Sequence, residues 1–155
     1  MRKYFHEYQP AMGEEPVTIK IRVDFGCFHR EHSPIAYSLI DQELSRIPDD
    51  ERRFDFIEHE SGPETIAWIA LGTAGITLAK SLIDFITAII NARAKGREAG
   101  DRPDGKLLLI IRDTHRADSS TEEFVMEIYD KEMVSSKQVK DAIEKGIQKR
   151  NRKRR

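Results

Sequence analysis

The chain has 155 residues, of which 34% are charged, and its formal net charge at pH 7 is −1. This length is sufficient for one domain with its own core, and the single cysteine, Cys27, excludes an intramolecular disulfide. Residues 1–16 contain neither the apolar run nor the cleavage site of a secretory signal, so we expect a cytoplasmic protein.

The N-terminal part predicts a flexible arm followed by a strand. Residues 1–16 show no hydrophobic period and contain two prolines, which favours an irregular arm. The segment VTIKIRVDF, residues 17–25, alternates apolar and polar side chains, as expected for a strand with one buried face. Lys20 and Arg22 share its polar face, but no aromatic side chain accompanies them there. The strand therefore lacks the pattern of a nucleic-acid-binding sheet.

A helix and a second strand come next in the chain. Ser33 and Pro34 have the pattern of an N-cap followed by proline in the first turn. The apolar residues that follow recur at helical spacing until Pro48, where we expect the helix to end. In the segment RRFDFIEHE, Phe54 and Phe56 lie two residues apart, which predicts a strand with one apolar face.

The most apolar segment is ETIAWIALGTAGITLAKSLIDFITAIINA, Glu64 to Ala92, and it predicts one long helix from Glu64 to Arg97. Its polar residues fall at spacings of three and four, which places them in one narrow stripe of a helix. They are Thr73, Thr77, Lys80, Asp84, Thr87 and Asn91. The stripe and its two charges argue against a simple bilayer span, which needs about 20 apolar residues.

The remaining arc of this predicted helix is broader than one sheet face requires. A helix of this length would extend about 50 Å, beyond the sheet of a small domain. We therefore expect an oligomer or partner interface on the apolar side. Its candidate residues are Trp68, Leu71, Gly75, Leu78, Leu82, Phe85, Ile86 and Ile89. A wholly internal helix and a membrane-associated helix are the alternatives.

The last third predicts two strands and a capped helix. KLLLIIRD, residues 106–113, reads as a strand covered on both faces, and EEFVMEIYDK, residues 122–131, as a further strand. Ser135 and Gln138 have the spacing of a capping box at the start of the final helix. The apolar stripe of that helix consists of Val139, Ala142, Ile143 and Ile147.

These elements together predict an α+β fold in the order β-α-β-α-β-β-α. The two strand-helix-strand connections favour parallel neighbours, and the last two strands favour an antiparallel hairpin. We expect a small, mixed four-stranded sheet with helices mainly on one face. The domain would span residues 17–148, between the flexible arm at 1–16 and a basic, disordered tail at 149–155.

The tail KRNRKRR carries six basic residues: Lys149, Arg150, Arg152, Lys153, Arg154 and Arg155. Removing these six charges from the net −1 leaves −7 on the rest of the chain. A basic segment on an acidic body predicts non-specific binding of nucleic acid or anionic lipid. A solvated terminus without a ligand is the alternative interpretation.

The motifs of common enzyme classes are absent from the sequence. It contains no glycine-rich nucleotide loop, no Gly-x-Ser-x-Gly and no His-Glu-x-x-His, so we expect neither a cofactor nor catalysis. Cys27, His29 and His32 are weak candidates for a metal site or a Cys/His enzyme, but their spacing matches no established zinc motif.

The order of elements resembles one protein family. The segment IAWIALGTAGITLA, the break GDRPDG, and the strands KLLLIIRD and FVMEIYDK followed by a capped helix are similar to the effector-associated constant component proteins. These are small bacterial accessory proteins encoded near the effectors of conflict systems. The resemblance implies an adaptor without catalytic residues. We therefore expect a non-enzymatic interaction module, with a membrane-associated protein as the alternative.

Overall fold

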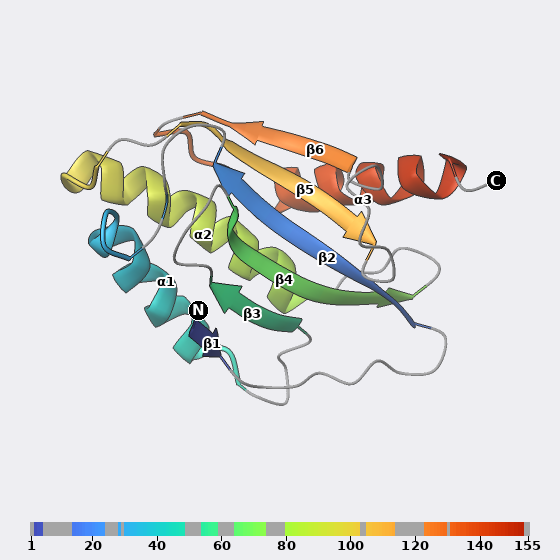
Figure 1. The fold of residues 1–155 in the computed structure, drawn as a ribbon, viewed down its shortest axis with the longest axis horizontal. Coiled ribbons are helices and arrows are strands. Elements are labelled where there is room, and N and C mark those ends of the chain that lie inside the picture. Colours follow the sequence, from blue (N-terminus) through green and yellow to red (C-terminus); the bar gives the residue numbers. More distant parts are fainter. Residues whose placement is uncertain are drawn as a thin grey trace.

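The computed structural model describes residues 2–4, 14–23, 28, 30–48, 54–58, 64–73, 80–102, 105–113, 123–129 and 131–153. Within these ranges the chain forms six strands and three helices (Figure 1). Their order is β1 (Arg2–Tyr4), β2 (Glu14–Val23), α1 (Pro34–Arg46), β3 (Phe54–Glu58), β4 (Glu64–Thr73), α2 (Lys80–Ala99), β5 (Leu107–Asp113), β6 (Glu123–Ile128) and α3 (Ser136–Lys153).

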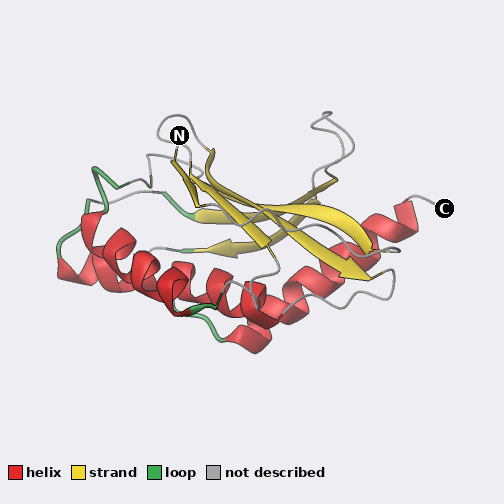
Figure 2. Cartoon of the chain, turned by 90° about the horizontal axis from the view of Figure 1, so that it is seen from below, coloured by secondary structure: helices red, strands yellow, loops and turns green. Residues whose placement is uncertain are grey.

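The strands form one antiparallel sheet in the order β1-β3-β4-β2-β5-β6. Helix α1 connects β2 to β3, which run parallel with β4 between them. Helix α2 connects β4 to β5, which run parallel with β2 between them. This is the split β-α-β arrangement of ferredoxin-like folds, extended by β1 at one edge and by β6 and α3 at the other. All three helices cover one face of the sheet (Figure 2).

The predicted α+β class is confirmed, whereas the predicted four-stranded mixed sheet is wrong. Both crossovers do connect parallel strands, but in each case an antiparallel strand inserts between them, so no two neighbours are parallel. The predicted flexible arm is also wrong in part. Residues 2–4 pair with β3, and β2 begins at Glu14 rather than at Val17.

The predicted helix from Glu64 to Arg97 does not exist as one element. Its first part is strand β4, which lies between β3 and β2, and of its described residues those from Lys80 onward belong to helix α2, which continues to Ala99. Trp68 is the register partner of Ile19 on one side and of Phe56 on the other. In sequence, a short continuous apolar run fits a strand as well as a segment of buried helix. Residues 74–79 lie outside the described part.

The broad apolar arc of α2 is covered by the chain itself. The sheet lies over α2, and α1 and α3 lie on opposite sides of it (Figure 1). Leu82, Ile86 and Ile89 are each 0% exposed. The rings of Phe56 and Phe85 meet edge to face at 5.2 Å. The expected partner interface is therefore wrong for the helical positions, because these side chains form the domain core.

The other residues expected at that interface lie elsewhere. Trp68 and Leu71 belong to strand β4, not to a helix. Gly75 and Leu78 lie outside the described residues. The eight residues therefore do not form one helix face.

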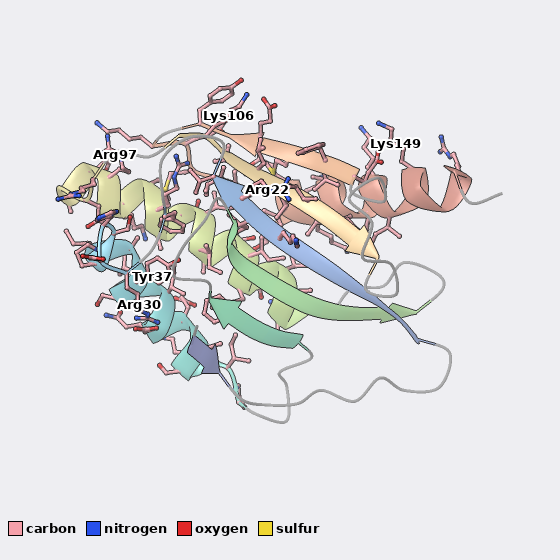
Figure 3. The ribbon with its side chains drawn as sticks, in the orientation of Figure 1. Arg22, Arg30, Tyr37, Arg97, Lys106 and Lys149 are labelled. Carbon is pink, nitrogen blue, oxygen red and sulfur yellow. The ribbon has the colours of Figure 1, made fainter. Side chains whose placement is uncertain are left out.

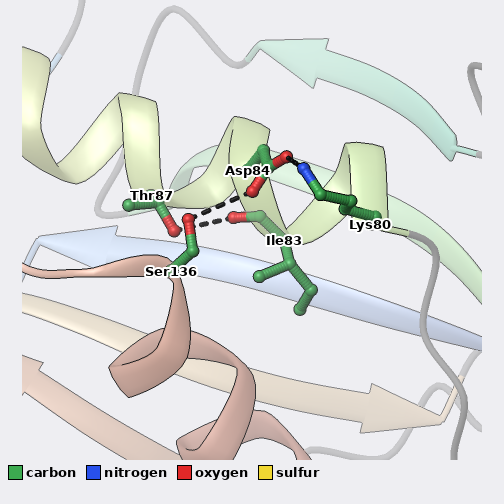
Figure 4. A network of polar contacts seen from close by, with 5 residues as sticks. All are labelled: Lys80, Ile83, Asp84, Thr87 and Ser136. Atoms are coloured by element: carbon green, nitrogen blue, oxygen red, sulfur yellow. Dashed lines mark hydrogen bonds and ion pairs between the residues drawn. The ribbon is translucent and has the colours of Figure 1, made fainter.

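The polar stripe of α2 holds the start of α3 (Figure 4). The side chain of Asn91 accepts a hydrogen bond from the Val134 N–H (2.8 Å) and donates one to the Val134 carbonyl (2.9 Å). Ser136 Oγ donates to Asp84 Oδ1 (3.1 Å), and Lys80 Nζ donates to Asp84 Oδ2 (2.6 Å). The hydrogen bond to Asp84 and the charge of that carboxylate hold the pKa of Lys80 above its ordinary value. The stripe thus fixes where α3 begins.

A buried carboxylate joins the end of α2 to the start of α1. The predicted N-cap lies at Ser33, but the Ser33 side chain makes no cap hydrogen bond. Asp101 replaces it, because its Oδ1 accepts from the Ile35 N–H (3.1 Å) and its Oδ2 from the Ala36 N–H (2.9 Å). Asp101 reaches this position through a Schellman turn, in which its own N–H binds the carbonyl of Gly96 (2.9 Å) and Gly100 has a φ of +117°.

Replacing Asp101 with alanine should lower the free energy of unfolding by about 1–3 kcal/mol, because a buried N–H of α1 (Ala36) and a part-buried one (Ile35) lose their acceptor. Asp101→Asn retains one carbonyl acceptor and should lose less. Chemical denaturation followed by circular dichroism measures both. Asp141→Ala, at an exposed position of α3, is the matched control and should change stability by less than about 0.5 kcal/mol. Equal stability of the Asp101→Ala and Asp141→Ala variants would contradict the capping role.

Candidate anion-binding groove

A groove of about 410 Å³ lies between strand β6 and the C-terminal half of helix α3. Its described lining combines apolar and small residues with cations, and includes no acidic residue. The lining residues are Phe124, Val125, Ala142, Lys145, Gly146, Gln148, Lys149 and Arg152. Figure 3 labels Lys149 on α3, beside the end of β6 at which that strand begins. The groove therefore has the charge of an anion-binding site.

Helix α3 supplies the cations from one side. Its capping box is confirmed, because the Gln138 N–H binds Ser135 Oγ (3.2 Å) and the Ser135 N–H binds Gln138 Oε1 (2.8 Å). Val139, Ile143 and Ile147 are buried under the sheet. Lys145, Lys149 and Arg152 follow one another at spacings of four and three, so a different side of the helix carries them as a row.

The predicted disordered tail is wrong for most of its length. Helix α3 continues to Lys153, so Lys149 and Arg152 lie on an ordered helix. Basic side chains in the last turn offset the negative end of the helix dipole, which favours helix here despite the like charges. Nothing is described of the Arg150 and Lys153 side chains, or of residues 154–155.

Gly146 lets α3 approach the sheet closely at the floor of the groove. A Cβ atom at this position would lie 2.0 Å from Cγ1 of Val125 and 3.0 Å from Cδ1 of Ile111. Val125 is β-branched and has little freedom to move away. The glycine therefore sets the distance between α3 and β6, and with it the width of the groove.

A β-bulge decides which side chains of β6 face the groove. Leu109 pairs with Met126, but Ile110 pairs with Phe124, so Val125 is an extra residue in β6. Without this shift Phe124 would be the partner of the buried Ile111. With it, Glu123 takes that place and is 7% exposed, whereas Phe124 is 58% exposed. Bulges re-aim side chains in this way, and this one pairs Phe124 with Ile110, on the face of the sheet away from α3.

The bulge also orients one of the cations. Lys149 Nζ lies 3.3 Å from Oε1 of Glu123, the residue that the bulge turns inward. The lysine side chain is nevertheless 67% exposed, so it remains accessible from the groove. Among the described residues, neither Lys145 nor Arg152 forms an ion pair. The groove therefore presents one cation held by the sheet and two that are exposed to solvent.

The structure brings together two residues predicted for anion binding, Lys149 and Arg152, and adds Lys145 and Phe124. Lys145 was detectable as part of the same helical row, but Phe124 was not, because its exposure depends on the bulge.

Of the weak metal candidates, Cys27 and His29 lie outside the described residues, and His32 lies in the turn before α1. Within the described residues no three His, Cys, Asp or Glu side chains are grouped as a metal site.

Comparisons with protein-family models, with curated proteins and with solved structures gave no match. None of the helices in the described part of the chain combines the length and apolar character that a bilayer crossing requires.

Replacing Gly146 with alanine should lower the free energy of unfolding by about 1–2 kcal/mol. Overpacking against Val125 costs about 1–3 kcal/mol, and the better helix propensity of alanine returns up to about 1 kcal/mol. Thermal and chemical denaturation measure the difference. Lys137→Ala, at an exposed position of the same helix, is the control. A stability gain in the Gly146→Ala variant would show that α3 does not lie close to β6.

Proposed function

We propose that the protein is a non-enzymatic interaction module that binds an anionic partner in the groove between β6 and α3. The observation that carries this proposal is the row of Lys145, Lys149 and Arg152 along the groove, in which Glu123, beside Lys149, offsets one of three positive charges. The body of the chain is acidic, so this local excess of positive charge directs an anion to one place.

The groove is suited to a polymer rather than to a single small anion. From Lys145 to Arg152 the helix advances seven residues, which corresponds to about 10 Å along its axis. A cation row of this length matches several successive charges of a polyanion. Binding would be driven by release of counterions, so its affinity should fall steeply with salt concentration.

An adaptor role, as the family resemblance implies, is part of this proposal. The binding surface differs from the one expected from the sequence, because the apolar side of α2 is occupied by the sheet, α1 and α3. The groove provides a separate, exposed surface that leaves the core intact when a partner binds. Catalysis is not part of the proposal, since the lining residues combine cations and apolar groups without a nucleophile–base pair.

The proposal predicts that Lys145→Gln/Lys149→Gln/Arg152→Gln weakens binding of fluorescently labelled heparin by about tenfold or more at low salt. The slope of log affinity against log salt concentration should decrease in magnitude by about 2. Fluorescence anisotropy across a salt series measures both quantities.

The matched control is Lys95→Gln/Lys137→Gln/Lys140→Gln, which removes the same charge from exposed positions outside the groove. Its affinity should stay close to that of the unmodified protein. If the two triple variants lose affinity equally, net charge rather than the groove determines binding, and the proposal is wrong. Circular dichroism establishes that both variants fold.

A further inference from the structure

We infer that the anionic partner is an acidic protein segment with apolar side chains, whose carboxylates bind Lys145, Lys149 and Arg152 while an apolar side chain covers the floor of the groove. This inference rests on the proposed function and adds a class of partner to it. It combines two observations on one groove: the cation row on α3 and the apolar floor beside it.

The floor of the groove is apolar and only partly covered. Val125 from β6 and Ala142 from α3 line it, and both residues are half-buried. Gly146, which also belongs to the lining, adds no polar side chain. A ligand made only of charged groups would leave this surface in contact with water, whereas an aliphatic side chain would bury it. Because removing apolar surface from water is favourable, the floor distinguishes between partners of equal charge.

The cation row matches carboxylates that are carried on a polypeptide. Along the helix axis Lys149 lies about 6 Å from Lys145, and Arg152 lies about 4.5 Å further on. Alternate side chains of an extended segment are about 6.6 Å apart, so acidic residues at every second position fall close to successive cations. Gln148 is exposed in the same lining and can both donate and accept a hydrogen bond, as a peptide group requires. An acidic segment therefore fits the charged, the neutral polar and the apolar parts of the lining together.

A single-stranded nucleic acid is the main competing occupant, and the lining offers it less. Its phosphates could bind the three cations, but such ligands are held largely through bases stacked on aromatic rings. Phe124, the one aromatic residue of the described lining, pairs with Ile110 on the face of the sheet away from α3. The described part of the groove therefore provides no stacking surface beside the cations, and phosphates would leave the apolar floor uncovered.

The acidic segment would bind through its side chains and not as an added strand. Strand β6 lies at the edge of the sheet, where strand addition needs a regular row of free backbone groups. The bulge at Val125 interrupts that row, and bulges on edge strands are a common protection against strand addition. Recognition then depends on the pattern of acidic and apolar residues in the partner.

The test compares two peptides of equal charge that differ in their apolar residues. A labelled peptide of about ten residues carries glutamate at every second position and two leucines among the intervening glycines, and its control carries serine in place of leucine. Both are titrated with the full chain and followed by anisotropy. The leucine peptide should bind about 10- to 100-fold more tightly than its control.

Two variants of the floor locate this preference in the groove. Ala142→Leu fills the floor, and Val125→Thr makes it more polar with little change of shape. Each should reduce the preference for the leucine peptide by about fivefold or more. Both variants should bind heparin within about twofold of the unmodified protein, because the three cations are retained.

The triple glutamine variant separates this inference from the proposed function. It should weaken binding of heparin and of both peptides, because all three ligands depend on the cations. If it does so while the leucine peptide binds no more tightly than its control, or while the preference is unchanged in both floor variants, the inferred class of partner is wrong and the anion groove stands. If oligothymidylate of equal charge binds more tightly than the leucine peptide, the partner is a nucleic acid and the inference is overturned. If the triple variant binds heparin normally, the proposed function itself is wrong.

Discussion

The burial of α2 is the constraint on which the rest of the structure depends. This helix touches the sheet, α1 and α3, and its apolar residues such as Leu82 and Ile89 are completely buried. Its polar side chains form hydrogen bonds with neighbouring elements. Asn91 and Asp84 hold the start of α3, and the turn that ends α2 delivers Asp101 to the start of α1. Arg93, a buried residue of α2, donates to the carbonyl of Ile128 at the end of β6 and to that of Gly105. Strand β6 and helix α3 are therefore both positioned from α2.

The candidate groove follows from that placement together with two local features. Gly146 allows α3 to lie against Val125, and the bulge at Val125 turns Phe124 outward and Glu123 inward. Glu123 then holds Lys149 beside the strand. A single extra residue in β6 thus exposes Phe124 on one face of the sheet and turns Glu123 to the other face, where it holds Lys149.

Local patterns in the sequence predicted the elements whose structure is decided locally. The alternation in VTIKIRVDF predicted β2, and the spacing of Ser135 and Gln138 predicted the start of α3, because each pattern reports its own element directly. The segment from Glu64 to Thr73 was predicted as helix because a continuous apolar run fits either structure. Only its pairing with β2 and β3, which are distant in sequence, makes it a strand. Lys149 and Arg152 were found by their charge, but Phe124 was not. Simple alternation in β6 would have placed Phe124 on the same face as the buried Ile128, and the bulge is not visible in the sequence.

The most direct test of the account is to locate the ligand on the protein by NMR. Heparin oligosaccharide would be added to ¹⁵N-labelled protein, and the changes in backbone amide shifts would be followed residue by residue. The account predicts that the largest changes fall on Phe124 and Val125 of β6 and on the turns of α3 around Lys145 and Lys149, and that they decrease as salt is added. Changes centred on α1 or on the β1 edge of the sheet, with β6 and α3 unaffected, would contradict it.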